Sequence, residues 1–138
     1  MGAAVKITAD TNVLVRAVTL DDDEQSPVAA STLRQAELVA VPVPVLCELV
    51  WVLTRGYGLT RAQAAAAVRT LTQASNVVTD AAAVETGLAV LDAGGDFADG
   101  AIAHDGATLG ADTFVTFDRQ AARLVAEVGV PARLLGPA

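Results

Sequence analysis

Residues 39–56, VAVPVPVLCELVWVLTRG, carry the pattern from which the fold is predicted. The first five are apolar and rich in valine, which favours a short strand over 39–43. Pro44 suits the first turn of a helix, because an amide hydrogen there would have no partner within the helix. The glycines at 56 and 58 are typical of a helix end. A strand followed directly by a helix is the repeating unit of an α/β protein.

The alternation of strand and helix continues on both sides of this segment. We expect short strands over 4–10, 39–43, 76–79, 112–117 and 131–135, and helices over 12–18, 27–38, 44–56, 61–74, 81–92, 97–109 and 118–127. This order indicates an α/β fold with a mostly parallel central sheet flanked by helices. With 138 residues and no low-complexity linker, the chain is expected to form a single domain over 1–138.

Several helix starts are marked by side chains suited to bonding free backbone amides. Ser26 before Pro27 predicts a helix that is capped by the serine and begins at the proline. Thr60 and Gln63 have the spacing of a capping box, in which each side chain bonds the backbone N–H of the other residue. Asp80 is expected to cap the helix that follows it.

The composition limits both the compartment and the partners. No apolar run approaches the roughly 18 residues of a membrane span, and no apolar signal-peptide core precedes the first acids. The one cysteine, Cys47, cannot form an internal disulfide, which favours a reducing, cytoplasmic setting. A net charge of −7 argues against a broad basic surface for nucleic acid. It leaves room for a nuclease that binds metal first, because a divalent cation reverses the local sign of an acidic site.

A single carboxylate, Glu48, lies inside the apolar run 41–53. Burying an unpaired carboxylate costs several kcal/mol or more, and no basic residue lies close to it in the sequence. A buried Glu48 would therefore need another partner, such as a cation shared with other acids.

Two further acids are predicted to lie at the same edge of the sheet. In parallel α/β sheets, sites form outside the carboxyl ends of the strands. Asp10 closes the first predicted strand, and Asp118 follows directly after the strand 112–117. Glu48 falls about one turn into the helix after the second strand, near the same edge.

The segment GGDFADGAIAH supplies the fourth candidate acid, Asp99, early in its helix. Ile102 and Ala103, three and four residues further on, are expected to face the core. Asp96 lies three residues before Asp99, so we expect it close by, near the start of the helix.

Each acid alone has an alternative interpretation, since Asp10, Asp96 and Asp118 are each also suited to capping a helix. A shared site explains their common position at one sheet edge better than separate caps do. Clustered carboxylates raise each other's pKa unless a cation holds them. Mg²⁺ or Mn²⁺ is the cation that suits a site made only of oxygen ligands.

Other site chemistries fit the sequence poorly. One histidine, His104, and one cysteine are too few for an ordinary zinc site, and a Ser–His–Asp triad would need His104 in the middle of a helix. No G-x-x-x-x-G-K-[ST] loop is present, and GYG at 56–58 is too short for a dinucleotide fingerprint.

Two other carboxylate-based α/β families are also disfavoured. Haloacid-dehalogenase phosphatases carry D-x-D after the first strand, whereas Asp10 is followed at that spacing by Asn12. Both those phosphatases and response-regulator receivers use a late lysine, and the only lysine here, Lys6, precedes the acid.

Four segments together resemble the motifs of the PIN-domain ribonucleases, and among them the VapC-type toxins of bacterial toxin–antitoxin pairs. These segments are ADTNVLVRAVTLDDDEQS (9–26), VPVPVLCELVWVLTRGYGLTRAQ (41–63), DFADGAIAH (96–104) and FVTFDRQAARL (114–124). They occur in the family's order over nearly the whole chain. Two mild departures are Gly100, where alanine is more usual, and His104, where a small residue is common.

The resemblance implies an endoribonuclease that hydrolyses RNA phosphodiesters with one or two Mg²⁺ or Mn²⁺ ions. The residues that it assigns to the metal site are Asp10, Glu48, Asp99 and Asp118, with Asn12, Thr116 and Asp96 as polar neighbours of that site. Arg119 and Arg123 share one helical face and are candidates for contacting RNA phosphates, although exposed solubilising arginines are an equal alternative. Arg16 and Arg55 are weaker candidates.

The resemblance also implies partners: a cognate VapB-type antitoxin, an RNA substrate and a second copy of the chain in a homodimer, with no membrane. Trp51 and Tyr57 are candidates for an interface, with core packing as an equal alternative for Trp51. Two other functions stay open. One is a PIN nuclease for RNA processing outside a toxin–antitoxin pair, and the other is a catalytically silent PIN-like binding module.

Overall fold

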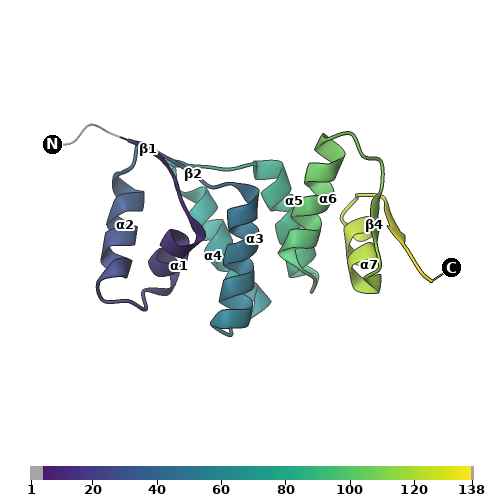
Figure 1. Cartoon of the computed structure of the whole chain (residues 1–138), viewed down its shortest axis with the longest axis horizontal. Helices are drawn as coiled ribbons and strands as arrows, with labels where there is room; N and C mark the ends of the chain where they lie inside the picture. The colour runs from purple at the N-terminus through teal and green to yellow at the C-terminus, as the bar shows by residue number, and fades with distance from the viewer. Residues whose placement is uncertain (1–4, 138) are drawn as a thin grey trace. The chain divides into compact units, whose positions relative to one another are not determined.

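The computed structural model describes residues 5–137, which form two compact units with a boundary between Thr79 and Asp80 (Figure 1). Ala4, the first residue of the predicted strand 4–10, lies outside the described residues. None of the helices in residues 5–137 has both the length and the apolar character needed to span a bilayer.

The first unit contains a three-stranded parallel sheet and four α-helices. Its elements are β1 (Lys6–Thr8), α1 (Thr11–Thr19), α2 (Gln25–Gln35), β2 (Leu38–Ala40), α3 (Val43–Trp51), the π-helical turn η1 (Val52–Gly56), α4 (Arg61–Gln73) and β3 (Val77–Val78). The strands are ordered β1-β2-β3, with Ile7 opposite Val39 and Val39 opposite Val77.

The second unit contains a two-stranded parallel sheet and three helices. Its elements are α5 (Ala81–Asp92), α6 (Phe97–Thr108), β4 (Phe114–Thr116), α7 (Arg119–Glu127) and β5 (Ala132–Leu134). β4 pairs with β5 in parallel. Parallel strands that alternate with helices confirm the predicted α/β class, and the five strands pair as two sheets.

Each unit has its own buried core. In the first unit Leu46, Leu49 and Leu53 are fully buried, and their spacing puts them on one side of the helical segment formed by α3 and η1. In the second unit Leu124 and Val125 of α7 pack with Val90 and Ala103. Each fully buried leucine contributes about 1.5–3 kcal/mol relative to an exposed one. These apolar faces orient the helices, and so decide which polar side chains point outward.

Two predicted helix starts are confirmed. The N–H of Gln63 donates to the Thr60 hydroxyl at 3.1 Å, and the N–H of Thr60 donates to the Gln63 side chain at 2.9 Å, which completes the capping box. The Asp80 carboxylate accepts a bond from the N–H of Ala83 at 3.1 Å at the start of α5.

The prediction that Ser26 caps a helix beginning at Pro27 is wrong. α2 begins two residues earlier, at Gln25, and Ser26 is buried within its first turn. The reason is Asp22, whose Oδ1 accepts bonds from the N–H groups of Glu24 at 3.0 Å and Gln25 at 2.6 Å. The carboxylate thus satisfies free amides at the helix start, a task that the sequence pattern assigned to the serine.

α3 begins at Val43, one residue before the predicted start, with Pro42 at its N-cap. Its last turn widens into η1, in which the N–H of Tyr57 donates to the carbonyl of Val52 at 3.1 Å, five residues back. Gly58, with φ +68°, then ends the helical segment in the left-handed region. The predicted end near Gly56 and Gly58 is therefore confirmed.

Gly100 allows α5 and α6 to approach closely. A Cβ atom at Gly100 would lie 2.5 Å from the carbonyl oxygen of Thr86 and 2.9 Å from the Cα of Gly87, both on α5. An alanine therefore would not fit at the position where the sequence departs from its family pattern. The close packing fixes the first turn of α6, which carries Asp99.

Candidate functional site

Asp10 follows β1 and forms the N-cap of α1. Its Oδ1 accepts a bond from the N–H of Thr11 at 2.8 Å, so the capping role considered from the sequence is confirmed. The bond engages one carboxylate oxygen, and the residue is exposed. A cap and a metal ligand are compatible roles, because a carboxylate has two oxygens and about four acceptor sites.

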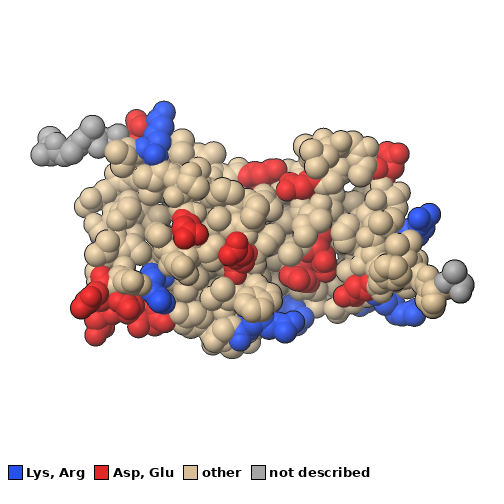
Figure 2. Space-filling model, viewed as in Figure 1, with Lys and Arg blue, Asp and Glu red and all other residues tan. Residues whose placement is uncertain are grey.

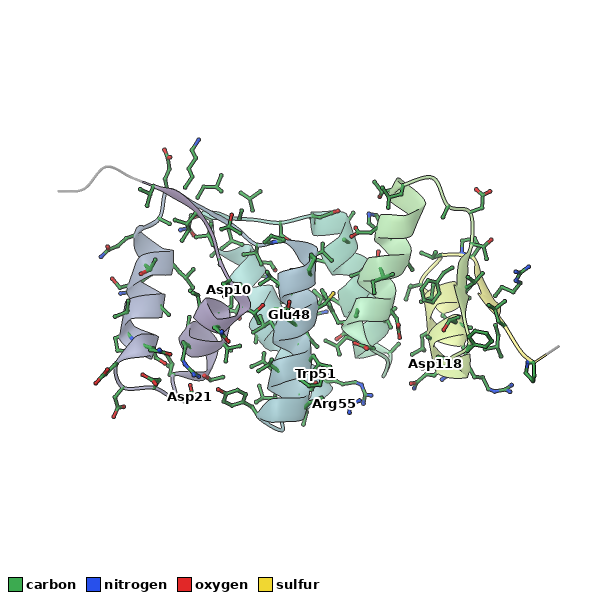
Figure 3. The ribbon with its side chains drawn as sticks, viewed as in Figure 1. Asp10, Asp21, Glu48, Trp51, Arg55 and Asp118 are labelled. Carbon is green, nitrogen blue, oxygen red and sulfur yellow. The ribbon has the colours of Figure 1, made fainter. Side chains whose placement is uncertain are left out.

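Glu48 is exposed, which contradicts its expected burial. Leu46, Leu49 and Val50 turn inward from α3, so Glu48 lies on the outer side of the same helix. A hydrated carboxylate does not carry the cost of burial. α1 and α3 pack against each other in the first unit, and Figure 3 shows Asp10 and Glu48 on the same viewed face of that unit.

The second unit brings three acids within electrostatic range. Asp99 lies half-buried in the first turn of α6. Burial raises the pKa of the Asp99 carboxyl above its ordinary value, and the negative charges of Asp96 and Asp118 raise it further. The ionised form of Asp99 is therefore less favourable here than in water, and a nearby positive charge would offset this effect.

Asp96 and Asp118 are both helix caps, as the alternative interpretation predicted. Asp96 Oδ1 accepts a bond from the N–H of Ala98 at 3.2 Å at the start of α6. Asp118 Oδ1 accepts a bond from the N–H of Ala121 at 3.0 Å at the start of α7. These bonds fix the two carboxylates in place beside Asp99.

The predicted polar neighbours are placed as follows. The hydroxyl of Thr116, at the end of β4, accepts a bond from the N–H of Asp118 at 3.0 Å and so holds the backbone that carries this acid. Asn12 is exposed in the first turn of α1. Arg123 lies 3.9 Å from Glu127 in an exposed ion pair, and Arg119 is exposed next to Asp118.

The donor chemistry at these acids fits a hard divalent cation. Carboxylate oxygens are the ligands that Mg²⁺ prefers, and a cation would offset the repulsion that raises the pKa of Asp99. Among residues 5–137, however, no three His, Cys, Asp or Glu side chains converge closely enough to hold an ion. Asp96, Asp99 and Asp118 thus influence one another electrostatically without forming a closed ligand group.

A polar network that the sequence did not suggest joins the start of the first unit to the turn after η1. The Tyr57 hydroxyl donates to Asp21 Oδ2 at 2.7 Å, and Arg16 Nη1 lies 3.3 Å from Asp21 Oδ1. Arg16 Nη1 also donates to the Tyr57 oxygen at 3.2 Å, and its Nε donates to Gln25 at 2.8 Å. The bond from Tyr57 is the largest cause of a lowered pKa at Asp21.

This network changes the interpretation of two residues. Arg16 is engaged within the chain, so it is a poorer candidate for contacting RNA, and Tyr57 uses its hydroxyl to anchor a turn. Acidic side chains gather around the connection between α1 and α2 (Figure 2). Because Tyr57 and Asp21 lie 36 positions apart, no local pattern could have predicted their contact.

Three apolar side chains near the candidate acids are more exposed than their type suggests. Trp51 is 61% exposed, so core packing, one of its two predicted roles, is wrong. Ala103 is buried, as predicted, but Ile102 is 56% exposed, contrary to prediction, because the buried side of α6 runs through Gly100 and Ala103. Phe117 is 75% exposed directly before Asp118.

Comparison with known proteins identifies one family. A model of the PIN domain matches residues 7–127. The matched range includes the four candidate acids and their three predicted polar neighbours, Asn12, Asp96 and Thr116. A search of curated proteins found no match.

Proposed function

Because the chain belongs to the PIN-domain family, whose members are generally nucleases, we propose that it is a Mg²⁺- or Mn²⁺-dependent endoribonuclease and the toxin of a VapBC-like toxin–antitoxin pair. The observation that carries the proposal is that the family match contains all four candidate acids, Asp10, Glu48, Asp99 and Asp118. Asp10 and Asp118 each follow a strand and cap a helix, where a backbone N–H binds the carboxylate, and Asp99 lies in the first turn of α6.

The residues that would hold the cation are Asp10, Glu48, Asp99 and Asp118. When bound, a divalent cation supplies positive charge to phosphate oxygens and lowers the pKa of water. The N–H of Ala121 holds the Asp118 carboxylate, and the N–H of Thr11 holds that of Asp10. These bonds limit rotation of the two carboxylates, which favours a preorganised site for in-line attack on a phosphodiester.

Asn12, Thr116 and Asp96 would support this chemistry indirectly. Thr116 holds the N–H of Asp118 and so fixes the start of α7. Asn12 lies two residues after Asp10 on the exposed side of α1, where its amide can orient a carboxylate or a water. Asp96 raises the pKa of Asp99 and so favours a cation beside it.

The proposed partners are RNA, a VapB-type antitoxin and a second copy of the chain, all in the cytoplasm. The acidic net charge of −7 supports an antitoxin that presents arginine, because guanidinium groups bind carboxylates in bidentate pairs. Exposed Arg119 supports contact with RNA phosphate next to Asp118. A small antitoxin-like reading frame directly upstream of the gene is expected, and its absence would favour an RNA-processing nuclease.

The nuclease proposal is tested by Asp10→Asn. Asparagine keeps the cap of α1 but loses the charge that a cation needs. Cleavage of RNA in Mg²⁺ should fall by about two orders of magnitude or more, as when a group that stabilises transition-state charge is lost. The melting temperature should stay close to that of the original chain.

The matched control is Asp23→Asn, which removes the same charge from an exposed acid between α1 and α2. Cleavage by this variant should be unchanged. Ordinary cleavage by Asp10→Asn would show that the assignment of the site is wrong.

A further inference from the structure

The exposed side of α3 and η1 carries an acidic, an aromatic and a basic side chain in addition to a proline. Within 43–55, the exposed residues are Pro44, Glu48, Trp51 and Arg55, and all others are buried or half-buried. Their spacing of four, three and four residues places them in one stripe along the helix. Figure 3 shows Glu48, Trp51 and Arg55 following one another along this segment.

Trp51 exposes an aromatic surface that a folded chain ordinarily buries. It is the only tryptophan of the chain, and 61% of it is exposed. Tryptophan is highly buried on average, and a large aromatic left in water forgoes considerable stabilisation. The exposure therefore suggests a ligand with a flat apolar face.

Arg55 places a positive charge beside this indole. Four residues bring a helix back to nearly the same side, and η1 retains this relation across its wider turn. Unlike Arg16 and Arg123, Arg55 has no ion-pair partner among residues 5–137. Its guanidinium is thus available for an anion.

The surrounding contacts hold this segment in place. The Thr54 hydroxyl donates to the carbonyl of Val50 at 2.8 Å, and the Tyr57 hydroxyl binds Asp21 directly after η1. Leu53 is fully buried on the opposite side. Trp51 and Arg55 therefore project from an anchored backbone.

We propose that Trp51 and Arg55 form a subsite for one unpaired nucleotide of a single-stranded RNA. The indole would stack on the base, and the guanidinium would bind the adjacent phosphate. Glu48, a candidate metal ligand of the same unit, lies three residues before Trp51 on the same exposed side. The inference rests on the proposed ribonuclease function and adds that its substrate is unpaired where the enzyme holds it.

Charge favours RNA over a protein as the occupant. Tryptophan and arginine are both common in protein interfaces, but acidic residues are depleted there, and Glu48 lies three residues before Trp51 on the same exposed side. In a chain of net charge −7, an unpaired arginine beside an exposed indole matches the two parts of a nucleotide, a phosphate and a base.

The single tryptophan allows a direct test, because the intrinsic tryptophan fluorescence comes from Trp51 alone. Titration with a single-stranded oligoribonucleotide of about ten nucleotides, in EDTA to prevent cleavage, should quench this fluorescence saturably. The same titration of Asp10→Asn in Mg²⁺ should also quench it. A hairpin duplex of equal length should quench it less, because its bases are already stacked.

Arg55→Gln should weaken this binding several-fold and reduce the slope of log K against log salt by about 0.7, the value for one phosphate contact to a single strand. Arg34→Gln is the matched control. It removes the same charge from an exposed arginine of α2, in the same unit, and should leave binding unchanged.

Trp51→Ala should weaken binding of a labelled oligoribonucleotide about tenfold or more in fluorescence anisotropy, while Trp51→Phe should retain most of the affinity. Circular dichroism should show an unchanged fold, because Trp51 is exposed. Unchanged affinity in Trp51→Ala overturns the proposal. The proposal is also overturned if Trp51→Ala converts a dimer into a monomer while the affinity for RNA stays the same. That result would show that this surface binds a second copy of the chain.

Cleavage assays separate this inference from the nuclease proposal. In Mg²⁺, Trp51→Ala should raise KM for the RNA with little change in kcat, because the subsite binds substrate without touching the reacting atoms. If KM and kcat are the same in the original chain and in Trp51→Ala, the subsite proposal is wrong, and the nuclease proposal is unaffected. If RNA quenches the Trp51 fluorescence but the original chain does not cleave RNA, the subsite proposal is supported and the nuclease proposal is wrong.

Discussion

Asp99 is the residue whose surroundings most oppose its ionised form. Burial raises the pKa of its carboxyl, and the charges of Asp96 and Asp118 act in the same direction. Its pKa in the folded state therefore lies above that in the unfolded state. This carboxyl contributes stability below the unfolded pKa, and the contribution is lost as pH rises through the folded pKa.

Asp99→Asn is therefore expected to raise the melting temperature of the metal-free protein at pH 7. Asparagine cannot ionise, so the variant escapes the repulsion that Asp99 meets at neutral pH. The gain should disappear below the ordinary carboxyl pKa of about 3.9, where the original residue is also neutral. Thermal melts in EDTA at several pH values measure this difference.

The control for Asp99→Asn is Asp112→Asn, which removes an exposed acid from the same unit. Its melting temperature should follow that of the original chain at each pH. A lower melting temperature for Asp99→Asn at pH 7 would contradict the proposed repulsion.

Glu48 supports a second prediction at this scale. Because Glu48 is exposed, Glu48→Gln should change the free energy of unfolding by no more than about 0.5 kcal/mol. Mn²⁺ affinity should fall by at least about tenfold if the carboxylate is a ligand. Isothermal titration calorimetry measures the affinity, with Glu37→Gln, an exposed acid between α2 and β2, as the control. No Mn²⁺ binding by the original chain would favour a catalytically silent module.

At the scale of elements, the pairing of α5 with α6 depends on a glycine. Gly100 lies where any side chain would meet the carbonyl oxygen of Thr86. In an isolated helix, a glycine at this position would lower stability by about 0.5–1 kcal/mol relative to alanine. The close approach of α5 and α6, which only a residue without a side chain allows, compensates for this loss of helix stability.

Gly100→Ala should lower the free energy of unfolding by about 1–2 kcal/mol, since overpacking costs about 1–3 kcal/mol and the gain in helix propensity offsets only part of it. Chemical denaturation measures the change. Gly106→Ala on the same helix is the control, because a Cβ there meets no atom within 4 Å. It should stabilise the protein, and an equal gain at Gly100 would contradict the packing argument.

The elements themselves were largely predictable, because capping and periodicity act locally. The Thr60–Gln63 box and the Asp80 cap appear as expected. The prediction of a Ser26 cap was wrong because Asp22, four residues earlier, accepts bonds from the N–H groups of Glu24 and Gln25, and the helix begins before the serine. The expectation that Glu48 is buried was wrong because it was based on the apolar neighbours of this residue. The spacing of Leu46, Leu49 and Leu53 already implied an outward face of the helix between them.

At the scale of the whole molecule, the class of fold follows from the sequence but the pairing of strands does not. Strands of two or three residues, such as β3, contain too few side chains to specify a neighbour. Parallel pairing between β4 and β5 depends on contacts made through α7, which no local pattern shows. The capping positions of Asp10, Asp96 and Asp118 follow from local patterns at the ends of elements, whereas the contact of Tyr57 with Asp21 joins residues 36 positions apart.

Metal should stabilise the whole chain if it binds the folded acids. At a hundredfold excess over Kd, the expected gain is about 2.7 kcal/mol. Thermal melts with and without Mg²⁺ measure it, with sodium chloride of equal ionic strength as the control. An equal rise in Asp10→Asn would show that the stabilisation does not involve the proposed ligand.

The π-helical turn also restricts how the length of the chain can vary. η1 contains one residue more than an α-helical turn would need, and Tyr57 reaches Asp21 directly after it. Deleting one residue from 52–56 would remove this extra residue and leave an ordinary α-helical turn, with little change in the direction of Tyr57. Related chains that are one residue shorter here should therefore retain both the tyrosine and the aspartate, whereas larger changes in length should lose their contact.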